Sequence, residues 1–344
     1  MDKILIGIVG YKSENHIFNC LKSVVNQSHK NFDVVYFDNF GADKALNIVS
    51  EHFPQVKCIK STKNLGYGNS HNVIMSEYNY DFYMPLNPDV ILEPNFLTEA
   101  LTVFQKSKEQ IGAVNGIILF GDNENKTDLI YSCGHIMHKD RRNEDMHNGM
   151  KITEADISPR FIFGPNGACP LFKKEMIIDI SVRGNLFDKF FFMYGDDVDV
   201  GWRISKAGWK TAFVPECKAW HSVGGSKPFE NRKVRAEYIA NRYILILKND
   251  SLVLFLRDIP FIILIEILFF SIQTLKHPAF IIDFLCATLK VIKMIPYAMY
   301  TRKEITCRTN LQLQSHFIEK KYLQRLKRFV MRQTAKSRNL SNLK

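Results

Sequence analysis

The segment "YGDDVDVGWR" (residues 194–203) places three carboxylates, Asp196, Asp197 and Asp199, within four positions, and Arg203 follows closely. A buried carboxylate without a partner is destabilising or takes up a proton, so such a cluster requires a cation, a proton to exchange, or water. Aromatic residues flank the cluster in "FDKFFFMY" and "VGWRISKAGW", which favours packed surroundings over a solvated helix start. The segment is therefore a candidate for a catalytic base or a metal site.

Oxygen ligands for a hard cation stand in "NPDV" (residues 87–90), where Asn87 and Asp89 flank a proline. Mg²⁺ and Mn²⁺ prefer such ligands and share them with phosphate groups. The same residues also suit an ordinary turn at the end of a strand. His221, in "AWHSVGG", is a further metal-ligand candidate, although a single histidine is more often structural than a ligand.

The segment "NLGYGNSHN" (residues 64–72) contains Asn64, Gly66, Gly68 and Asn72 just before a helix expected near Ser70. Free backbone N–H groups and the positive end of the helix dipole favour a diphosphate at such a position. An ordinary glycine turn is the alternative.

Short apolar runs predict the strands that position these residues. They lie at 4–9, 32–39, 56–61 and 80–86, and they alternate with helical patterns. The first helix carries Ile17, Leu21, Val24 and Val25 at helical spacing, and Ser13 is expected to cap it. This alternation predicts an α/β fold with a doubly wound, mostly parallel sheet.

In such a sheet, ligands bind at the carboxyl ends of the strands. Residues 10–11, 38, 64–72 and 87–89 all follow strand ends, so we expect them to meet in one nucleotide-binding crevice. The chain contains neither GxGxxG nor GxxxxGK[ST], so neither a dinucleotide fold nor a P-loop is indicated. Residues 120–160 are polar without a clear period and are expected to be an insertion or loop region near the site. The sheet is expected to resume over residues 161–172, followed by a helix from Lys174.

Taken in order, these motifs resemble the inverting glycosyltransferases of family 2, most closely their bacterial rhamnosyltransferase-like branch. The resemblance spans roughly residues 3–250 and also includes "VGYKSENHIFNCLKSVVNQSH" at the start, "DN" after the second strand and "WHSVGGS". It implies a GT-A fold and a nucleotide-sugar donor. It also implies a single displacement that inverts the anomeric configuration and is assisted by Mn²⁺ or Mg²⁺.

The resemblance also implies roles for individual residues. Asp197 matches the catalytic base, Asp89 and His221 match metal ligands, and Asp196, Asp199 and Arg203 orient the base and the acceptor or brace the helix. The donor-binding residues would be Val9, Gly10, Tyr11, Asp38, Asn64, Gly66, Gly68, Asn72 and Asn87. Trp202 and Trp209 are sugar platforms or, more simply, core aromatics. Two positions depart from the family pattern, because Lys12 replaces an Asn and Asn87 replaces an Asp.

The charge of the chain is concentrated at its C-terminus. Residues 302–344 contain twelve Lys and Arg against two Glu, and therefore account for +10 of the formal charge of +11. A nucleic-acid-binding core is not expected, whereas this tail suits an anionic membrane surface. Seven scattered cysteines without CxxC spacing and the lack of a signal-peptide pattern indicate the cytoplasm.

We expect three regions: a GT-A domain (1–250), apolar or amphipathic helices (251–301) and the basic tail (302–344). Arg257, Asp258, Pro260 and Glu266 interrupt the apolar run 252–275, so a membrane-spanning helix is not predicted. The apolar helices would lie in the membrane interface, which places the protein peripherally on the cytoplasmic face. The alternative is that they pack on the catalytic domain or form a homodimer interface.

The expected function is transfer of a sugar to a growing, lipid-linked cell-surface glycan. The branch resemblance favours deoxythymidine diphosphate rhamnose as donor, followed by UDP-hexoses or a galactofuranose donor. The alternative is a catalytically inactive subunit that binds sugar nucleotides or glycans, and the presence of Asp89, Asp197 and His221 argues against it.

Overall fold

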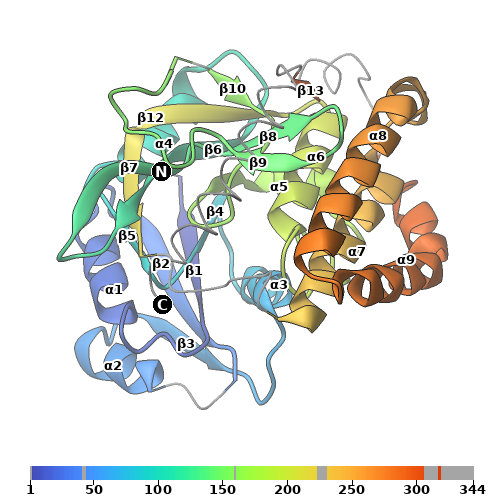
Figure 1. The fold of residues 1–344 in the computed structure, drawn as a ribbon. Coiled ribbons are helices and arrows are strands. Elements are labelled where there is room, and N and C mark those ends of the chain that lie inside the picture. The colour runs from blue at the N-terminus through green and yellow to red at the C-terminus, as the bar shows by residue number, and fades with distance from the viewer. Residues whose placement is uncertain (1, 41–43, 159, 223–230, 306–316, 319–344) are drawn as a thin grey trace.

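A ten-stranded mixed sheet forms the centre of the molecule, in the order β10-β12-β6-β11-β4-β1-β2-β3, with β5 and β7 attached to β12 and β6. Figure 1 shows this sheet with helices packed around it. The computed structural model describes residues 2–40, 44–158, 160–222, 231–305 and 317–318.

The N-terminal half of the sheet is parallel, as the sequence predicted. Its strands are β1 (Ile4–Gly10), β2 (Phe32–Asp38), β3 (Lys57–Lys60) and β4 (Phe82–Leu86). Alternate residues of β1 face opposite cores because side chains alternate across a strand. Ile4, Ile6 and Ile8 pack on one face. Leu5 packs on the other.

Helices cover both faces of this half, which makes the sheet doubly wound. The first core is closed by α1 (Ile17–Val25), α2 (Ala45–His52) and α4 (Phe96–Lys106). The second is closed by α3 (Tyr67–Glu77), α5 (Lys174–Ile180) and α6 (Asp196–Lys206).

The other half of the sheet is mixed. The strand β11 (Leu171–Lys173) runs antiparallel to both β4 and β6 (Ile111–Gly121), and β12 (Lys210–His221) runs parallel to β6. Shorter strands complete it: β5 (Val90–Leu92), β7 (Lys126–Ser132) and β10 (Phe161–Ile162). A separate small sheet joins β8 (His135–His138) to β9 (Asn143–Asp145) and β13 (Phe317–Ile318).

Two local predictions are wrong, and two are confirmed. The main sheet resumes with β10 and β11 over residues 161–173, and α5 begins at Lys174, both as predicted. The helix α3 begins at Tyr67, three residues before its predicted start. Residues 120–160, by contrast, are not irregular but contain β7, β8 and β9. The side chain of Ser13 does not cap α1, because its hydroxyl lies 3.1 Å from the Tyr36 hydroxyl instead.

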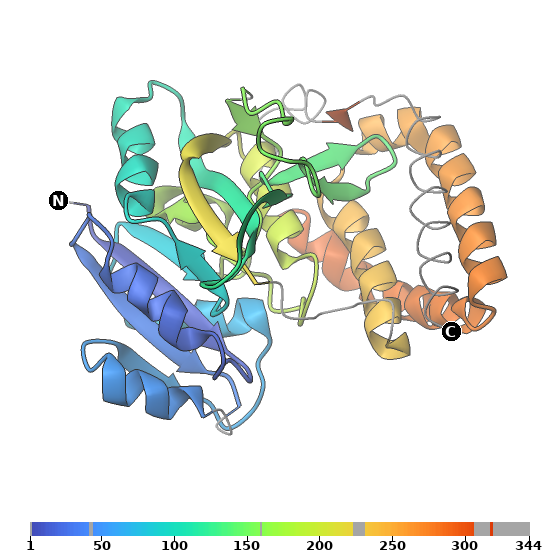
Figure 2. The same ribbon diagram turned by 60° about the vertical axis from the view of Figure 1, so that its left-hand side comes forward.

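Three C-terminal helices lie beyond α6, at the end of the molecule far from α2 (Figures 1 and 2): α7 (Arg232–Asn249), α8 (Leu252–Lys276) and α9 (Phe280–Thr301). Ile244 of α7, Ala287 of α9 and Trp202 of α6 share one apolar core. The structure thus attaches these helices to the domain that carries α6. In the part of the chain that the structure describes, none of the helices is apolar over a stretch long enough to cross a bilayer.

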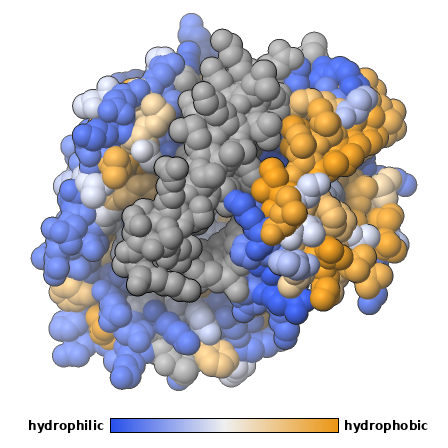
Figure 3. Space-filling model, in the orientation of Figure 1, coloured by the Kyte–Doolittle hydropathy of each residue, from blue (hydrophilic) through white to orange (hydrophobic). Residues whose placement is uncertain are grey.

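Many large apolar side chains of α8 and α9 remain exposed, and Figure 3 shows them gathered over these helices. We call this surface the outer apolar face. It comprises Leu252, Val253, Leu256, Ile263, Leu264, Ile267 and Leu275 of α8 and Ile281, Ile282, Leu285, Leu289, Ile292 and Ile295 of α9.

Candidate active site

The start of α6 presents Asp196 and Asp197. Gly195 precedes them in the left-handed conformation with φ of 93°, which a glycine adopts without strain. One turn further, Gly201 packs against Gly164, because a Cβ added at Gly201 would lie 2.9 Å from the Gly164 Cα. This close approach brings the first turn of α6 next to the loop after β10.

Both oxygens of the Asp197 carboxylate accept hydrogen bonds. Oδ2 accepts from Nε2 of His135 at 2.9 Å and from the Gly167 N–H at 3.2 Å, and Oδ1 accepts from the Val198 N–H at 2.8 Å. Burial raises the pKa of Asp197, but the His135 charge and these hydrogen bonds outweigh it, so the pKa falls below its ordinary value. Asp197 is therefore ionised and held in one orientation.

His135 is the functional residue that the sequence interpretation missed. It lies on β8, its side chain is 4% exposed, and its Nδ1 is 3.5 Å from the Asp145 carboxylate. Burial lowers the pKa of His135, but Asp197 and Asp145 raise it to about 9 overall. The imidazole is thus a cation at neutral pH, between two carboxylates.

Asp196 differs from its neighbour. Its Oδ2 is buried without a hydrogen-bond partner in the described residues. Burial and the negative charge of Asp197 raise the pKa of Asp196 to about 7. The pKa values of these two adjacent carboxyl groups are therefore shifted in opposite directions.

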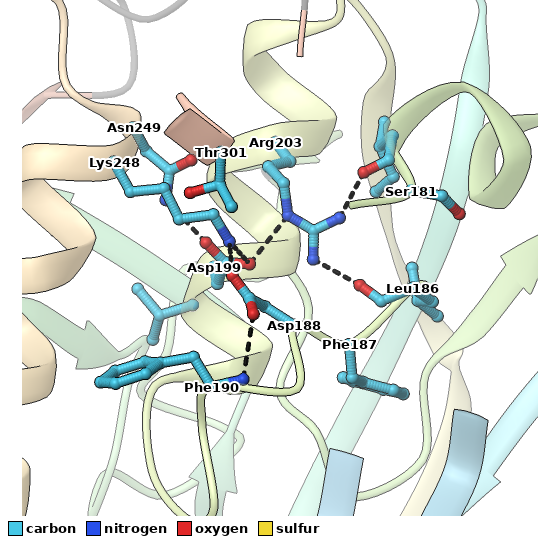
Figure 4. A network of polar contacts seen from close by, with 12 residues as sticks. Ser181, Leu186, Phe187, Asp188, Phe190, Asp199, Arg203, Lys248, Asn249 and Thr301 are labelled. Atoms are coloured by element: carbon cyan, nitrogen blue, oxygen red, sulfur yellow. Dashed lines mark hydrogen bonds and ion pairs between the residues drawn. The ribbon is translucent and has the colours of Figure 1, made fainter. Parts of the chain in front are cut away.

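Asp199 and Arg203 form part of a buried ion network, shown in Figure 4. The Arg203 Nε donates to Asp199 at 2.8 Å, and its remaining nitrogens donate to the backbone carbonyls of Ile180, at the end of α5, and Leu186. Lys248 of α7 bridges Asp199 and Asp188 at 2.8 and 2.6 Å. Neither Asp199 nor Arg203 lines the cavity described below. Asp199 and Arg203 were expected either to orient the base and the acceptor or to brace the helix. The contacts described here brace α6.

Of the two tryptophans of this region, Trp202 borders the cavity described below, whereas Trp209 does not. Trp202 is 1% exposed and packs in the core shared by α6 and α7. The indole of Trp209 donates to Asp179 at 2.7 Å.

The carboxyl ends of β1 and β2 lie side by side, since Gly10 is paired with Asp38. Tyr11 and Phe40, which follow these strands, are each 50% exposed, and their ring centroids are 6.2 Å apart. Asp38 is buried and Val9 is half-buried. Phe40 was not among the predicted donor-binding residues, although it follows the "DN" pair directly. Two exposed aromatic rings beside a carboxylate suit a nucleoside base.

Lys12 follows Tyr11 in the left-handed conformation, with φ of 55°. Its Nζ lies 5.5 Å from the centroid of the Tyr11 ring.

The segment 64–72 packs α3 against the chain that precedes α6. Gly66 has φ of 78°, and a Cβ there would meet the Phe192 carbonyl oxygen at 2.3 Å. A Cβ at Gly68 would meet Phe187 at 2.7 Å. Asn72 exchanges two hydrogen bonds with the Phe187 backbone, and the Asn64 side chain accepts from the Gly66 N–H. These contacts are structural, and a role for these residues in donor binding stays a prediction.

Asp89 and His221 come together from distant parts of the sequence, because β12 pairs with β5. The His221 Nε2 is 3.1 Å from Asp89 Oδ1, and His221 Nδ1 is buried without a hydrogen-bond partner in the described residues. The described residues contain no group of three or more His, Cys, Asp or Glu able to hold a metal ion. The pair therefore fits a cation that takes its other ligands from a diphosphate and water.

A cavity of about 1200 Å³ lies beside Asp197, and its lining does not include Tyr11, Asp38 or Asp89. Its lining includes Asn87, Tyr67, His135, Asp197 and His221. The Tyr67 hydroxyl donates to the Gly167 carbonyl at 2.5 Å, which ties α3 to the same loop that holds Asp197. The candidate base and one candidate metal ligand thus face a common space.

The doubly wound sheet, the residues at its strand ends and the carboxylates over a large cavity define a glycosyltransferase of the GT-A class. The chain belongs to glycosyltransferase family 2, since the family described as "Glycosyltransferase like family 2" matches residues 2–239.

Relatives and solved structures agree with this assignment. N-acetylglucosaminyl-diphospho-decaprenol L-rhamnosyltransferase of Mycobacterium tuberculosis is 22% identical over 268 residues, 73% of this chain and 86% of the relative. Rhamnosyltransferase WbbL of Escherichia coli K12 is 26% identical over 262 residues, 72% of this chain and 96% of the relative.

Two solved structures share the fold. The mannosyltransferase PcManGT of Pyrobaculum calidifontis, in complex with GDP-Man and Mn²⁺, matches with a TM-score of 0.52 and 14% identity over 88% of this chain and 85% of that one. GalNAc-T7 with UDP, GalNAc and Mn²⁺ matches with a TM-score of 0.54 and 13% identity over 72% of this chain but only 48% of that one.

Proposed function

We propose that this glycosyltransferase moves L-rhamnose from deoxythymidine diphosphate rhamnose to a hydroxyl group of a lipid-linked glycan, with inversion. The observation that supports it most is the ionised Asp197, held by His135 over the shared cavity. The two rhamnosyltransferase relatives, matched over most of their lengths, support the choice of sugar.

In this mechanism, Asp197 takes the proton from the acceptor hydroxyl while that oxygen attacks the anomeric carbon. The new C–O bond forms as the bond to the diphosphate breaks, and the diphosphate leaves with the electron pair. Tyr11, Asp38 and Phe40 bind the nucleoside. Asp89 and His221 would hold a divalent cation, which neutralises charge on the diphosphate when bound.

We further propose that the protein works at the cytoplasmic face of the membrane as a peripheral protein. The outer apolar face supports this location, since soluble surfaces rarely expose so many large apolar residues together. The basic tail, which would add attraction to anionic lipid, lies almost entirely outside the described residues.

The test measures nucleoside diphosphate release from a panel of nucleotide sugars in the presence of Mn²⁺ or Mg²⁺ and a membrane-lipid extract. We expect release from the rhamnose donor and a loss of at least about a hundredfold in Asp197→Asn. The exposed Asp128→Asn, the same change on β7 outside the cavity, should leave the rate unchanged.

Calorimetric titration with the donor nucleotide separates binding from chemistry. Asp197→Asn should bind the nucleotide with unchanged affinity, because Asp197 acts on the acceptor. Turnover equal to wild type in Asp197→Asn would refute the base assignment. Nucleotide binding without release from any donor would instead favour the inactive binding subunit.

A further inference from the structure

The cavity next to Asp197 continues away from the sheet to the C-terminal helices. At one end its lining is polar and includes Tyr67, His135 and Asp197. At the other end its wall is formed by Ile265, Leu268, Phe269 and Ile272 of α8, all partly buried. A sugar acceptor alone would have no use for this apolar end.

Two arginines stand where the polar and apolar parts meet. Arg142, next to β9, and Arg242 of α7 both line the cavity and share the Glu266 carboxylate of α8, at 2.8 and 2.6 Å. The Arg142 guanidinium lies over the Phe269 ring, 4.1 Å from its centroid. This arrangement fixes α8 against α7 and places two cationic groups beside the apolar wall.

Both guanidinium groups already have acidic or carbonyl partners in the protein. Besides Glu266, Arg142 Nε forms an ion pair with Asp140 at 3.4 Å, and Arg242 donates to the Asp140 backbone carbonyl at 2.7 Å. Their Nε atoms are buried, so contact with a group in the cavity falls to the terminal nitrogens. Arginine N–H groups match phosphate oxygens in geometry and charge.

The helix α8 has one side in the cavity wall and another side in the outer apolar face. Residues 265, 268 and 272 face the cavity, whereas Ile263, Leu264 and Ile267 belong to the outer apolar face. One helix therefore separates the cavity from an exposed apolar surface. A chain that leaves the cavity past α8 would stay in contact with apolar side chains.

We propose that this cavity binds the acceptor as an amphiphile. Its sugar lies at Asp197, its phosphate or diphosphate lies against Arg142 and Arg242, and the first units of its lipid chain lie along Leu268 and Ile272. The inference rests on the proposed function and adds to it the place where the lipid part of the acceptor binds. The volume of about 1200 Å³ exceeds the usual range for a small-molecule site, as a substrate of three parts requires.

Photo-crosslinking of the full chain tests this inference without any turnover. The probe is a diazirine-bearing farnesyl diphosphate, used below its micelle concentration, and labelled peptides are mapped by mass spectrometry. We expect label on α8 between residues 265 and 272. Leu268→Glu should reduce it at least fivefold, because a carboxylate faces the chain and repels the diphosphate. Ile263→Glu, which places the same charge on the outer apolar face on the other side of α8, should retain it.

Competition on the wild-type protein removes any dependence on how the variants fold. Unlabelled farnesyl diphosphate should suppress the label at concentrations at least tenfold lower than either farnesol or inorganic pyrophosphate. Equal competition by farnesol, or label spread evenly along the outer apolar face, would overturn the inference.

Donor turnover, measured separately, distinguishes the two proposals. Asp197-dependent release from a nucleotide sugar without label on α8 would overturn the cavity assignment and leave the proposed function intact. Specific label on α8 without release from any donor would support the cavity assignment and count against the proposed function.

Discussion

Asp196 and Asp197 are neighbours in the sequence, yet their surroundings give them opposite properties. Asp197 is ionised because His135 and two backbone N–H groups outweigh its burial, whereas buried Asp196 has a pKa raised to about 7. A base must be ionised and oriented before it can accept a proton. The imidazolium of His135 supplies both conditions at once.

Replacing His135 should therefore change the pH dependence of the reaction. The variant His135→Gln lacks the cationic partner of Asp197. Burial then raises the pKa of the Asp197 carboxyl group. The acidic limb of kcat/KM should then move to higher pH by about one unit or more, with a lower maximal rate. A pH profile of nucleoside diphosphate release from pH 4 to 9 measures this shift.

The control for this variant is His138→Gln on the same strand. His138 is equally buried, but its Nε2 lies 2.9 Å from Glu144 and not from Asp197. Its pH profile should match that of the wild type. A His135→Gln profile that differs only in amplitude would show that His135 acts through folding alone.

The helix α6 depends on a network of buried charges. Asp199 neutralises both Arg203 and Lys248, and all three side chains are at most 1% exposed. In Asp199→Ala, the buried cations Arg203 and Lys248 lose the negative charge that they share. We therefore expect a loss of about 3–5 kcal/mol in the free energy of unfolding. Urea unfolding at pH 7 measures this loss.

The same network predicts how stability depends on pH. Burial raises the pKa of Asp199, but Arg203 and Lys248 lower it to about 2 overall, below the ordinary value of 3.8. A lowered carboxylate pKa contributes stability above the unfolded value that is lost as the pH falls towards the folded value. The difference between wild type and Asp199→Ala should shrink between pH 4 and pH 2.

The exposed pair of Glu109 and Lys210 provides the comparison for both measurements. Glu109→Gln should leave the urea midpoint at pH 7 unchanged, since exposed ion pairs contribute little. A loss in Asp199→Ala no larger than that in Glu109→Gln would contradict the role of the network.

Short apolar runs predicted the parallel half of the sheet, because strands buried on both faces leave a continuous apolar signal. The antiparallel additions were harder to predict. The strands β8 and β9 are only four and three residues long and lie within a polar region, so their pairing depends on tertiary contacts. The cap expected at Ser13 fails for a related reason, because Tyr36 offers its hydroxyl a partner from another strand.

The site could be predicted where it follows from motifs. The pairing of β12 with β5 brings His221 and Asp89 within 3.1 Å, although 132 positions separate them. His135 carried no signal, since a single histidine in an irregular polar segment shows neither its burial nor its partner. Its role follows only from the position of β8 beside α6.

At the scale of the molecule, one apolar core joins the catalytic domain to the C-terminal helices. The core that contains Trp202 of α6 also contains Ile244 of α7 and Phe280 of α9. The helices that carry the outer apolar face are thus joined through α7 to the helix that carries Asp197. Binding of this face to a bilayer would place the cavity close to the membrane surface.

The free energy with which the outer apolar face binds lipid vesicles should rise with the apolar area that it buries in the bilayer. Replacing both Ile263 and Ile267 by Glu should weaken binding to vesicles that contain anionic phospholipid by at least about a hundredfold. Each exposed isoleucine contributes about 1.5 kcal/mol or more when it is buried. Vesicle co-sedimentation at several lipid concentrations gives the two affinities.

Ile178→Glu provides the matched control, because Ile178 on α5 is 67% exposed but lies outside the outer apolar face. It should bind vesicles like the wild type. High salt should weaken binding of the wild type, since it screens the attraction between basic residues and anionic lipid. Unchanged vesicle binding in the double variant would mean that α8 and α9 do not contact the bilayer. A concentration-dependent dimer in gel filtration would then identify the outer apolar face as a contact between two copies of the chain.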